Sequence, residues 1–277
     1  MTSDESQSLN ALLEYVESEL GFATSHYTNS YLDRRVSSRV RRTASDGYGE
    51  YFCLLQSDQA EQAALLDAMS INVTGFFRNP DVWNGIRTVL RALSAQNDRI
   101  HAWSAPCADG REPYSLSMLA HDDEQINGDS LSVLGTDISE DALETARNGV
   151  YKESRTTDIA DELSFLDRYE EYVDHHNGTY TIRPHIKRPV SFERHDLIND
   201  APKRGFDIVI CRNLFIYIDN EHKKPMLETI AKSLRPEGFL VIGKAETIPT
   251  ELKSVFETLD GRLRIYQRTA TPSKARN

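Results

Sequence analysis

The stretch that decides the fold is "FDIVICRNLFIYIDN" at residues 206–220. Its first half is mostly apolar, which is typical of a strand buried on both faces of a sheet. Arg212 and Asn213 then interrupt the apolar run, and Tyr217 follows four residues later. Because ligands of open parallel sheets bind beyond the carboxyl ends of the strands, this pattern predicts a binding site above the end of this strand.

The sequence around this stretch alternates short apolar runs with helical patterns from residue 99 onward. The runs that predict further strands are "RIHAWSAP", "LSVLGTDI", "PVSFERHDL" and "GFLVIGKA". Helical patterns such as "SEDALETARNG" separate most of them, which predicts a doubly wound α/β fold with a parallel sheet. The chain then reads "SVFETLDGRLRIYQR", and its central Asp-Gly predicts a C-terminal antiparallel hairpin.

Three regions and one insertion follow from these patterns. Residues 1–70 show only helical periodicity and predict an N-terminal helical domain, as in "SLNALLEYVESEL". Residues 71–98 are expected to link it to an α/β domain spanning 99–277. Within that domain, residues 155–190 are too long for an ordinary connection, and "HHNGTYTI" resembles a hairpin. We expect a small antiparallel β insertion there.

The amino-acid composition disfavours several classes of binding partner. The chain has 277 residues, 39% of them hydrophobic, and a formal net charge of -11. Such a charge disfavours nucleic acid and anionic membranes as partners. The three cysteines show neither zinc spacing nor a disulfide framework, and no apolar run approaches the roughly 20 residues of a membrane-spanning helix. The N-terminus lacks a signal-peptide pattern, so a cytoplasmic protein without bound metal or membrane insertion is expected.

The predicted strand ends collect polar residues that suit a nucleoside with a charged tail. Glu112 alone could be an acid favoured at a helix N-terminus, and Asp137 alone could cap the helix that opens at Ser139. Together, however, four strand ends present the set Glu112, Asp137, Asp196, Arg212 and Asn213, with Leu197 beside Asp196 to cover a ring. Since the sequence has neither a Walker motif nor a G-x-G-x-x-G motif, a nucleoside without phosphates is favoured.

The segment "SINVTGFFRNPDVW" at residues 70–83 joins the helical region to the sheet. It places Asn72, Thr74 and Arg78 among aromatic residues. The alternative interpretation is a linker whose aromatic side chains pack between domains. We accept that interpretation for Phe76 and Phe77, and we expect Arg78 to belong to the site.

Taken together, these motifs resemble the chemotaxis receptor methyltransferase (CheR) family. The matching segments are "NVTGFFR", "GREPYS", "GTDIS", "HDL" and "FDIVICRNLFIYID", in family order and over nearly the whole chain. The resemblance implies a class I S-adenosylmethionine-dependent methyltransferase fold with the helical domain and the β insertion described above. It also implies methylation of glutamate carboxylates on chemoreceptors, with S-adenosylhomocysteine as the second product.

Carried over residue by residue, the resemblance implies a set of cofactor contacts. They are Asn72, Thr74, Arg78, Glu112, Asp137, Asp196, Leu197, Arg212 and Asn213. It places Arg78 and Tyr217 nearest the transferred methyl group, as the catalytic pair. Two departures stand out: the family's Gly-His-Ser-Glu after the fifth strand is here Gly243-Lys244-Ala245-Glu246, and Asp196 stands where Asn is common. We therefore assign no catalytic role to the loop at residues 243–246.

The helix "YLDRRVSSRVRR" concentrates arginines in an otherwise acidic chain. At 3.6 residues per turn, Arg35, Arg39 and Arg42 share one face, which we expect to bind the glutamate-bearing cytoplasmic helices of chemoreceptors. The alternative is a solvated charged face. The short insertion hairpin favours no tight binding of a receptor tail peptide, and a monomer is expected. Two rival functions stay open: a non-catalytic cofactor-binding adaptor, and another class I methyltransferase.

Overall fold

The computed structural model describes residues 3–69, 74–154 and 157–269. The chain forms two compact units. The helical unit comprises Met1–Ile71 together with Phe215–Lys223, and the sheet unit comprises Asn72–Leu214 together with Lys224–Asn277. The sequence patterns did not predict that a segment of the α/β region, residues 215–223, would pack with the helical unit.

The helical unit is built from amphipathic helices. They are α1 (Ser3–Leu20), the 3-10 turn η1 (Thr24–His26), α2 (Asn29–Arg42), α3 (Gly47–Ser57) and α4 (Gln59–Met69). Leu12 and Val16 of α1 are fully buried, as is Val36 of α2. Because these apolar residues recur every three to four positions, each helix buries one face. The predicted all-helical character of this region is confirmed.

Backbone hydrogen bonds attach residues 215–223 to this unit. The N–H of Thr28 donates to the carbonyl of Tyr217 at 2.9 Å, and the N–H of Asp219 donates to the carbonyl of His26 at 2.9 Å. An antiparallel bridge joins Tyr27 and Ile218. Residues 215–223 are therefore held in the helical unit by main-chain hydrogen bonds. No local sequence pattern predicts such long-range pairing.

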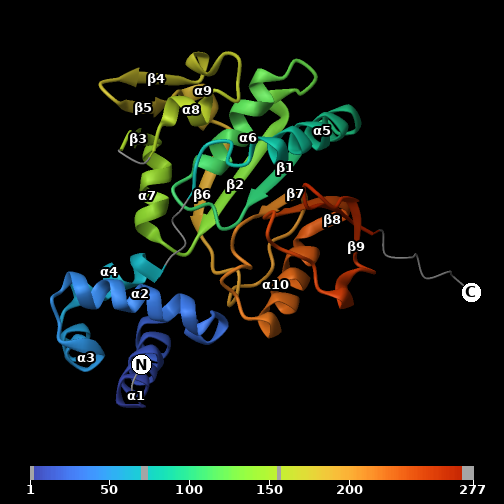
Figure 1. The fold of residues 1–277 in the computed structure, drawn as a ribbon. Helices are drawn as coiled ribbons and strands as arrows, with labels where there is room; N and C mark the ends of the chain where they lie inside the picture. Colours follow the sequence, from blue (N-terminus) through green and yellow to red (C-terminus); the bar gives the residue numbers. More distant parts are fainter. Residues whose placement is uncertain (1–2, 70–73, 155–156, 270–277) are drawn as a thin grey trace, which may run out of the picture. The chain divides into compact units, whose positions relative to one another are not determined.

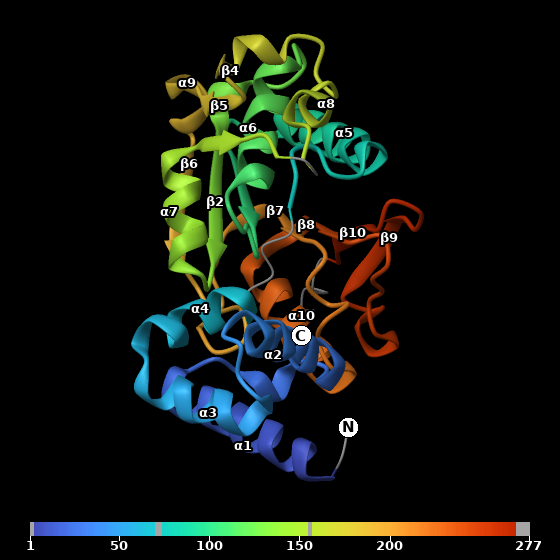
Figure 2. The same cartoon turned by 60° about the vertical axis from the view of Figure 1, so that its left-hand side comes forward.

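The sheet unit centres on a seven-stranded sheet in the order β6-β2-β1-β7-β8-β10-β9 (Figures 1 and 2). Its strands are β1 (Ile100–Ser104), β2 (Leu131–Asp137), β6 (Val190–Arg194), β7 (Phe206–Cys211), β8 (Leu234–Ile242), β9 (Phe256–Asp260) and β10 (Ile265–Arg268). The first five pair in parallel, and β10 pairs antiparallel with both β8 and β9. The predicted doubly wound sheet with a C-terminal antiparallel hairpin is confirmed.

Helices cover the sheet, and all of them except the first connect two of its parallel strands. They are α5 (Pro80–Gln96), α6 (Arg111–Asp122), α7 (Glu140–Asn148) and α10 (Asn220–Ser233). Ile208 and Ile210 of β7 join one apolar cluster with α5 and α6. Every residue of β7 is buried, as expected for a strand at the centre of a parallel sheet. Residues 71–98, predicted as a linker, contain the whole of α5, which belongs to the core of the sheet unit.

The β insertion forms a separate three-stranded antiparallel sheet in the order β3-β5-β4. Its elements are β3 (Val150–Lys152), α8 (Ile159–Leu163), the 3-10 turn η3 (Tyr169–Glu171), β4 (Val173–His176), β5 (Thr179–Ile182) and α9 (Pro184–Lys187). The hairpin turns at Asn177 and Gly178, which both have positive φ, the geometry that Asn-Gly favours. Strand β3 precedes the predicted start of the insertion.

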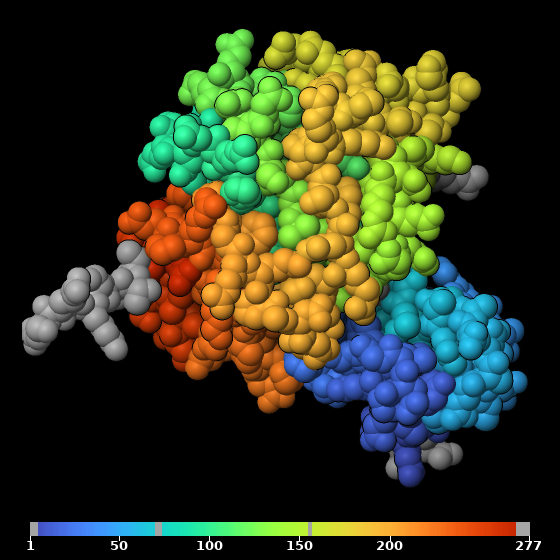
Figure 3. Space-filling model, turned by 180° about the vertical axis from the view of Figure 1, so that it is seen from behind, coloured from blue at the N-terminus to red at the C-terminus, as the bar shows by residue number. Residues whose placement is uncertain are grey.

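Two further 3-10 turns complete the sheet unit, η2 (Gly128–Ser130) and η4 (Thr250–Leu252). After the insertion, β6 forms the free edge of the large sheet, and the segment that follows it runs along the molecular surface (Figure 3). All five side chains of β6 are exposed or half-buried. Among the described residues, no helix is long and apolar enough to cross a membrane.

Candidate functional site

The carboxyl ends of β2, β1, β7 and β8 meet at one edge of the sheet because these neighbouring strands run parallel. The predicted polar residues Glu112, Asp137, Arg212 and Asn213 all follow these strand ends. The topology therefore brings together residues that lie up to about a hundred positions apart, as the 100-residue separation of Glu112 and Arg212 illustrates.

Asp137 ends β2 and is buried. Its Oδ2 accepts the N–H of Ala108 at 2.8 Å, and its Oδ1 accepts the N–H of Ser139 at 3.0 Å. The cap of α7 is Ser139 itself, whose Oγ accepts the N–H of Ala142 at 3.2 Å. The carboxylate of Asp137 therefore holds the loop after β1 in place. The N-cap of α7 is Ser139 and not Asp137, which was the alternative interpretation.

Glu112 lies in the first turn of α6 and is buried. Its Oε1 accepts a hydrogen bond from Ser104 Oγ at 2.8 Å, and its Oε2 lies 3.3 Å from Arg212 Nη1. Burial raises the pKa of the Glu112 carboxyl, and the charge of Arg212 opposes that rise. A carboxylate that only interacts with the helix dipole would not need these two partners. Glu112 therefore belongs to a buried polar cluster with Ser104 and Arg212.

Arg212 is buried and fixes the loop before α5. Its Nη2 donates to the carbonyl oxygen of Arg78 and to Asn79 Oδ1, both at 2.8 Å. Phe77 and Asn79 have positive φ, a conformation that side chains other than glycine rarely adopt without support. Arg212 therefore holds a strained loop in place while its Nη1 pairs with Glu112.

The side chain of Arg78, by contrast, is exposed. With Thr74 it lines a pocket of about 560 Å³ whose other lining residues are Gly75, Phe76, Phe77, Asn79, Pro80, Asp161, Glu162, Ser164 and Phe165. Glu162 Oε2 accepts the N–H of Phe76 at 2.9 Å and lies 3.6 Å from Arg111 Nη1. Phe76 and Phe77 are buried in the apolar cluster of the sheet unit, whereas the linker interpretation expected them to pack between domains. Asn72 lies outside the described residues.

Asp196 and Leu197 follow β6, but the carboxylate of Asp196 is used within its own loop. Its Oδ1 accepts the N–H groups of Ile198 at 2.8 Å and Asn199 at 3.2 Å, and its Oδ2 accepts Asn199 Nδ2 at 2.8 Å. Leu197 is buried. The structure thus gives Asp196 a turn-forming role, and its predicted cofactor contact stays a prediction.

Asn213 has a partner that the sequence patterns missed. It is half-buried with a φ of 62°, and its N–H donates to Glu246 Oε2 at 3.2 Å. The same oxygen accepts the N–H of Gly243 at 2.5 Å. Glu246 belongs to the loop after β8, to which the departure from the family motif led us to assign no catalytic role. The signal that could have revealed it is a Glu three residues after a Gly at a strand end.

Tyr217 belongs to the helical unit, where its ring centroid lies 4.7 Å from that of Tyr31. The guanidinium carbon of Arg35 lies 4.9 Å from the Tyr31 ring centroid, which is a cation–π distance. Arg39 is bound by Glu61 through two hydrogen bonds, from Nε at 2.9 Å and from Nη2 at 2.5 Å. Of the three predicted docking arginines, Arg42 is exposed and Arg35 and Arg39 are half-buried. The pairing with Glu61 gives Arg39 a structural role that the sequence did not predict.

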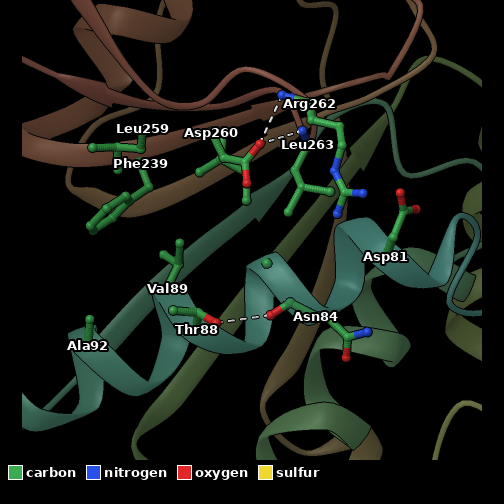
Figure 4. Close-up of a pocket in the computed structure, with 12 residues that line it drawn as sticks. Asp81, Asn84, Thr88, Val89, Ala92, Phe239, Leu259, Asp260, Arg262 and Leu263 are labelled. Atoms are coloured by element: carbon green, nitrogen blue, oxygen red, sulfur yellow. Dashed lines mark hydrogen bonds between the residues drawn. The ribbon is translucent and has the colours of Figure 1, made fainter.

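A second pocket, of about 500 Å³, lies between α5 and the β9–β10 turn (Figure 4). Val89, Phe239 and Leu259 supply apolar side chains, and Asp260 accepts the backbone N–H groups of Arg262 and Leu263 at 2.9 Å each. This pocket contains none of the predicted site residues. Across the described ranges, no group of three or more His, Cys, Asp or Glu side chains could hold a metal ion.

Comparison with known protein families identifies the family to which the chain belongs. Residues 72–265 match the family described as CheR methyltransferase, SAM binding domain, and residues 7–70 match CheR methyltransferase, all-alpha domain. The chain belongs to the CheR methyltransferase family. The resemblance noted from the motifs is thereby confirmed, and this CheR-family chain is an S-adenosylmethionine-dependent methyltransferase of chemotaxis.

Individual relatives agree with the family assignment. The chain is 32% identical over 235 residues to the chemotaxis protein methyltransferase of Listeria monocytogenes, covering 84% of this chain and 87% of that protein. It is 35% identical over 199 residues to that of Vibrio parahaemolyticus, covering 70% and 71% respectively. Among solved structures, a SAM-dependent methyltransferase from Geobacter sulfurreducens in complex with S-adenosyl-L-homocysteine matches at 15% identity and a TM-score of 0.36, covering 62% of this chain and 51% of that one.

The strand-end residues of this CheR-family enzyme fit the cofactor. Asp137 and Glu112 offer buried carboxylates that suit hydroxyl and ammonium groups. The Nε of Arg212 is buried and has no hydrogen-bond partner within the described part of the chain, so it suits an acceptor such as a carboxylate. These two acceptors and one donor match S-adenosylmethionine, whose amino-acid tail carries both an ammonium and a carboxylate.

Proposed function

We propose that this enzyme transfers the methyl group of S-adenosylmethionine to glutamate side chains of chemoreceptors, giving glutamate methyl esters. The observation that carries the proposal is the exposure of the Arg78 side chain at a pocket, on a loop that Arg212 holds in place. Arg212 is buried and occupied by Glu112, Arg78 O and Asn79, whereas the side chain of Arg78 is exposed at a pocket. An exposed guanidinium on a braced loop suits an incoming carboxylate.

The cofactor residues follow from the same cluster. In this proposal, Asp137 contacts the ribose hydroxyls, and Glu112 and Arg212 contact the charged tail. Asn213 reads the adenine edge, and Thr74, Asp196 and Leu197 complete the contacts that the family resemblance implies. When bound, the cofactor supplies an electrophilic methyl group on a sulfonium.

The protein has little acid–base chemistry to perform. A glutamate carboxylate has an unperturbed pKa of about 4.3 and is ionised at neutral pH, so it needs no general base. The task that remains is to orient the carboxylate and exclude water. Arg78 is suited to the first part as a bidentate donor, because its backbone carbonyl is fixed by Arg212. The predicted catalytic role of Tyr217 is part of the proposal.

Receptor docking is proposed for helix α2. Arg34, Arg41 and Arg42 are exposed, in a chain whose net charge is -11. Long receptor helices that carry glutamates would meet this basic face, with Arg35 held beside them by its stack on Tyr31. A cytoplasmic location follows if the partners are the cytoplasmic helices of chemoreceptors.

The test is methylation of receptor-containing membranes with S-adenosylmethionine labelled with tritium in the methyl group. The proposal expects base-labile label on a receptor band, and Arg78→Ala should lower its rate of formation at least tenfold, as for loss of an orienting group. Cofactor binding without any transfer would favour the adaptor function. Base-stable label, or label on a small molecule or nucleic acid, would favour another class of methyltransferase.

A further inference from the structure

Glu246 is a buried carboxylate that the proposed chemistry does not use. Its exposed fraction is 3%, and it closes the loop after β8 at the same sheet edge as the cofactor residues. Burying an ionised carboxylate is costly unless hydrogen-bond donors meet it. The backbone N–H groups of Asn213 and Gly243 both donate to its Oε2, at 3.2 Å and 2.5 Å.

The first of these donors is the cofactor residue Asn213. Its φ of 62° lies in the left-handed region, which Asn adopts more readily than most residues other than glycine, so local contacts decide whether it is held there. The hydrogen bond to Glu246 is a contact that selects this backbone geometry, and with it the direction of the Asn213 side chain in the loop after β7.

The neighbouring glycine shows how closely this arrangement is packed. A Cβ atom at Gly243 would lie 2.7 Å from Glu246 Oε2 and 2.9 Å from the backbone nitrogen of Asn213. Both distances are shorter than van der Waals contact, so a side chain at this position would push the carboxylate and the Asn213 backbone apart. Gly243, Glu246 and Asn213 therefore form one packed unit.

The outer part of the same loop is anchored separately. Lys244 Nζ lies 2.6 Å from Asp81 Oδ2 on α5, and the Lys244 carbonyl accepts a hydrogen bond from Arg264 Nε at 3.3 Å. The carboxylate of Asp81 is drawn at the edge of the pocket in Figure 4. This exposed ion pair offers a matched control, because it belongs to the same loop but does not touch Asn213.

We propose that Glu246 is a positioning residue for S-adenosylmethionine: it holds the left-handed backbone of Asn213 so that the side-chain amide faces the cofactor. The inference rests on the proposed role of Asn213 and not on the identity of the methyl acceptor. It gives a function to a loop whose departure from the family motif argued against one.

The test measures the affinity for S-adenosylhomocysteine by calorimetry, without receptor, in the full chain. Glu246→Leu should weaken binding about tenfold, because two donors lose their acceptor and Asn213 is released. Glu246→Gln keeps one oxygen that can accept both N–H groups and should restore most of the affinity. Asp81→Asn, which breaks only the outer ion pair, should leave the affinity unchanged.

A double-variant cycle separates positioning from general support. Asn213→Ala alone should weaken binding, and adding Glu246→Leu to it should cause little further loss, because the side chain to be positioned is already absent. An undiminished effect of Glu246→Leu in that background would overturn the proposal. So would unchanged affinity in Glu246→Leu, or in Asn213→Ala alone.

If Glu246→Leu fails to fold, Gly243→Ala takes its place in the same cycle. It should weaken binding while the variant stays folded, and unchanged affinity would again overturn the proposal. All these measurements are made without receptor. They therefore test the positioning role of Glu246 even if the enzyme is found not to methylate receptor glutamates.

Discussion

Replacing Arg212 by Leu tests the ionic cluster at the end of β7. The substitution removes the partner 3.3 Å from Glu112 and the two 2.8 Å hydrogen bonds to the loop before α5. A buried carboxylate would lose its nearest counter-charge, and only the weaker influence of Arg78 would remain. Removing one member of a buried ion pair typically costs about 3–5 kcal/mol, so we expect a loss of that size in the free energy of unfolding at neutral pH.

The loss should depend on pH, with a sign fixed by Glu112. Burial raises the pKa of its carboxyl above the ordinary value of 4.5, and Arg212 opposes that rise. Without Arg212 the folded-state pKa rises further. Between 4.5 and that pKa the folded protein binds a proton that the unfolded chain does not, so stability falls as pH rises through this window. The deficit of Arg212→Leu should therefore shrink as the pH is lowered toward 4.5.

The assay is denaturant unfolding followed by tryptophan fluorescence. Both tryptophans of the chain, Trp83 and Trp103, are fully buried in the sheet unit, so the signal reports the unit that contains the cluster. Glu112→Leu combined with Arg212→Leu should recover much of the stability, since no buried charge then lacks a partner. A loss below about 1 kcal/mol, or a deficit that grows on acidification, would refute the reasoning.

Substitutions at Asp137, Arg42 and Arg39, and labelling of the cysteines, test other parts of the structure. Asp137→Ala should weaken S-adenosylmethionine binding by about 1–3 kcal/mol in calorimetry, and unchanged affinity in the folded variant would remove this residue from the site. On helix α2, Arg42→Ala should raise the KM for receptor in a salt-dependent manner while leaving the melting temperature unchanged. Arg39→Ala should instead lower the melting temperature, because it leaves Glu61 without its bidentate partner, and equal behaviour of the two variants would contradict this division. Thiol labelling of the native protein should modify Cys53, which is exposed, and spare the other two cysteines, which are buried with raised thiol pKa values; mass spectrometry showing equal labelling would contradict this.

The sequence by itself determined the fold class and the family. Alternating buried strands and helices specify a parallel sheet, and the polar residues Asp137 and Arg212 at the strand ends predict a cofactor-binding edge, because these are local patterns that each segment carries on its own. Asn177-Gly178 likewise specifies its own hairpin turn. The S-adenosylmethionine cofactor and the enzyme class, expected from the motifs, are confirmed by the family match.

Only the tertiary structure decided how those residues are used. The sequence predicts Arg212 as a ligand of the cofactor but not its protein partners Glu112 and Arg78, which lie 100 and 134 residues away, because no local pattern encodes such a distance. The same holds for Glu61, which binds Arg39 from another helix, and for Glu246, which reaches Asn213 across two strand ends. The charge of a side chain is known from the sequence, whereas its interaction partner is known only from the packing of the folded chain. A cation that looks available in the sequence can therefore be bound within the fold.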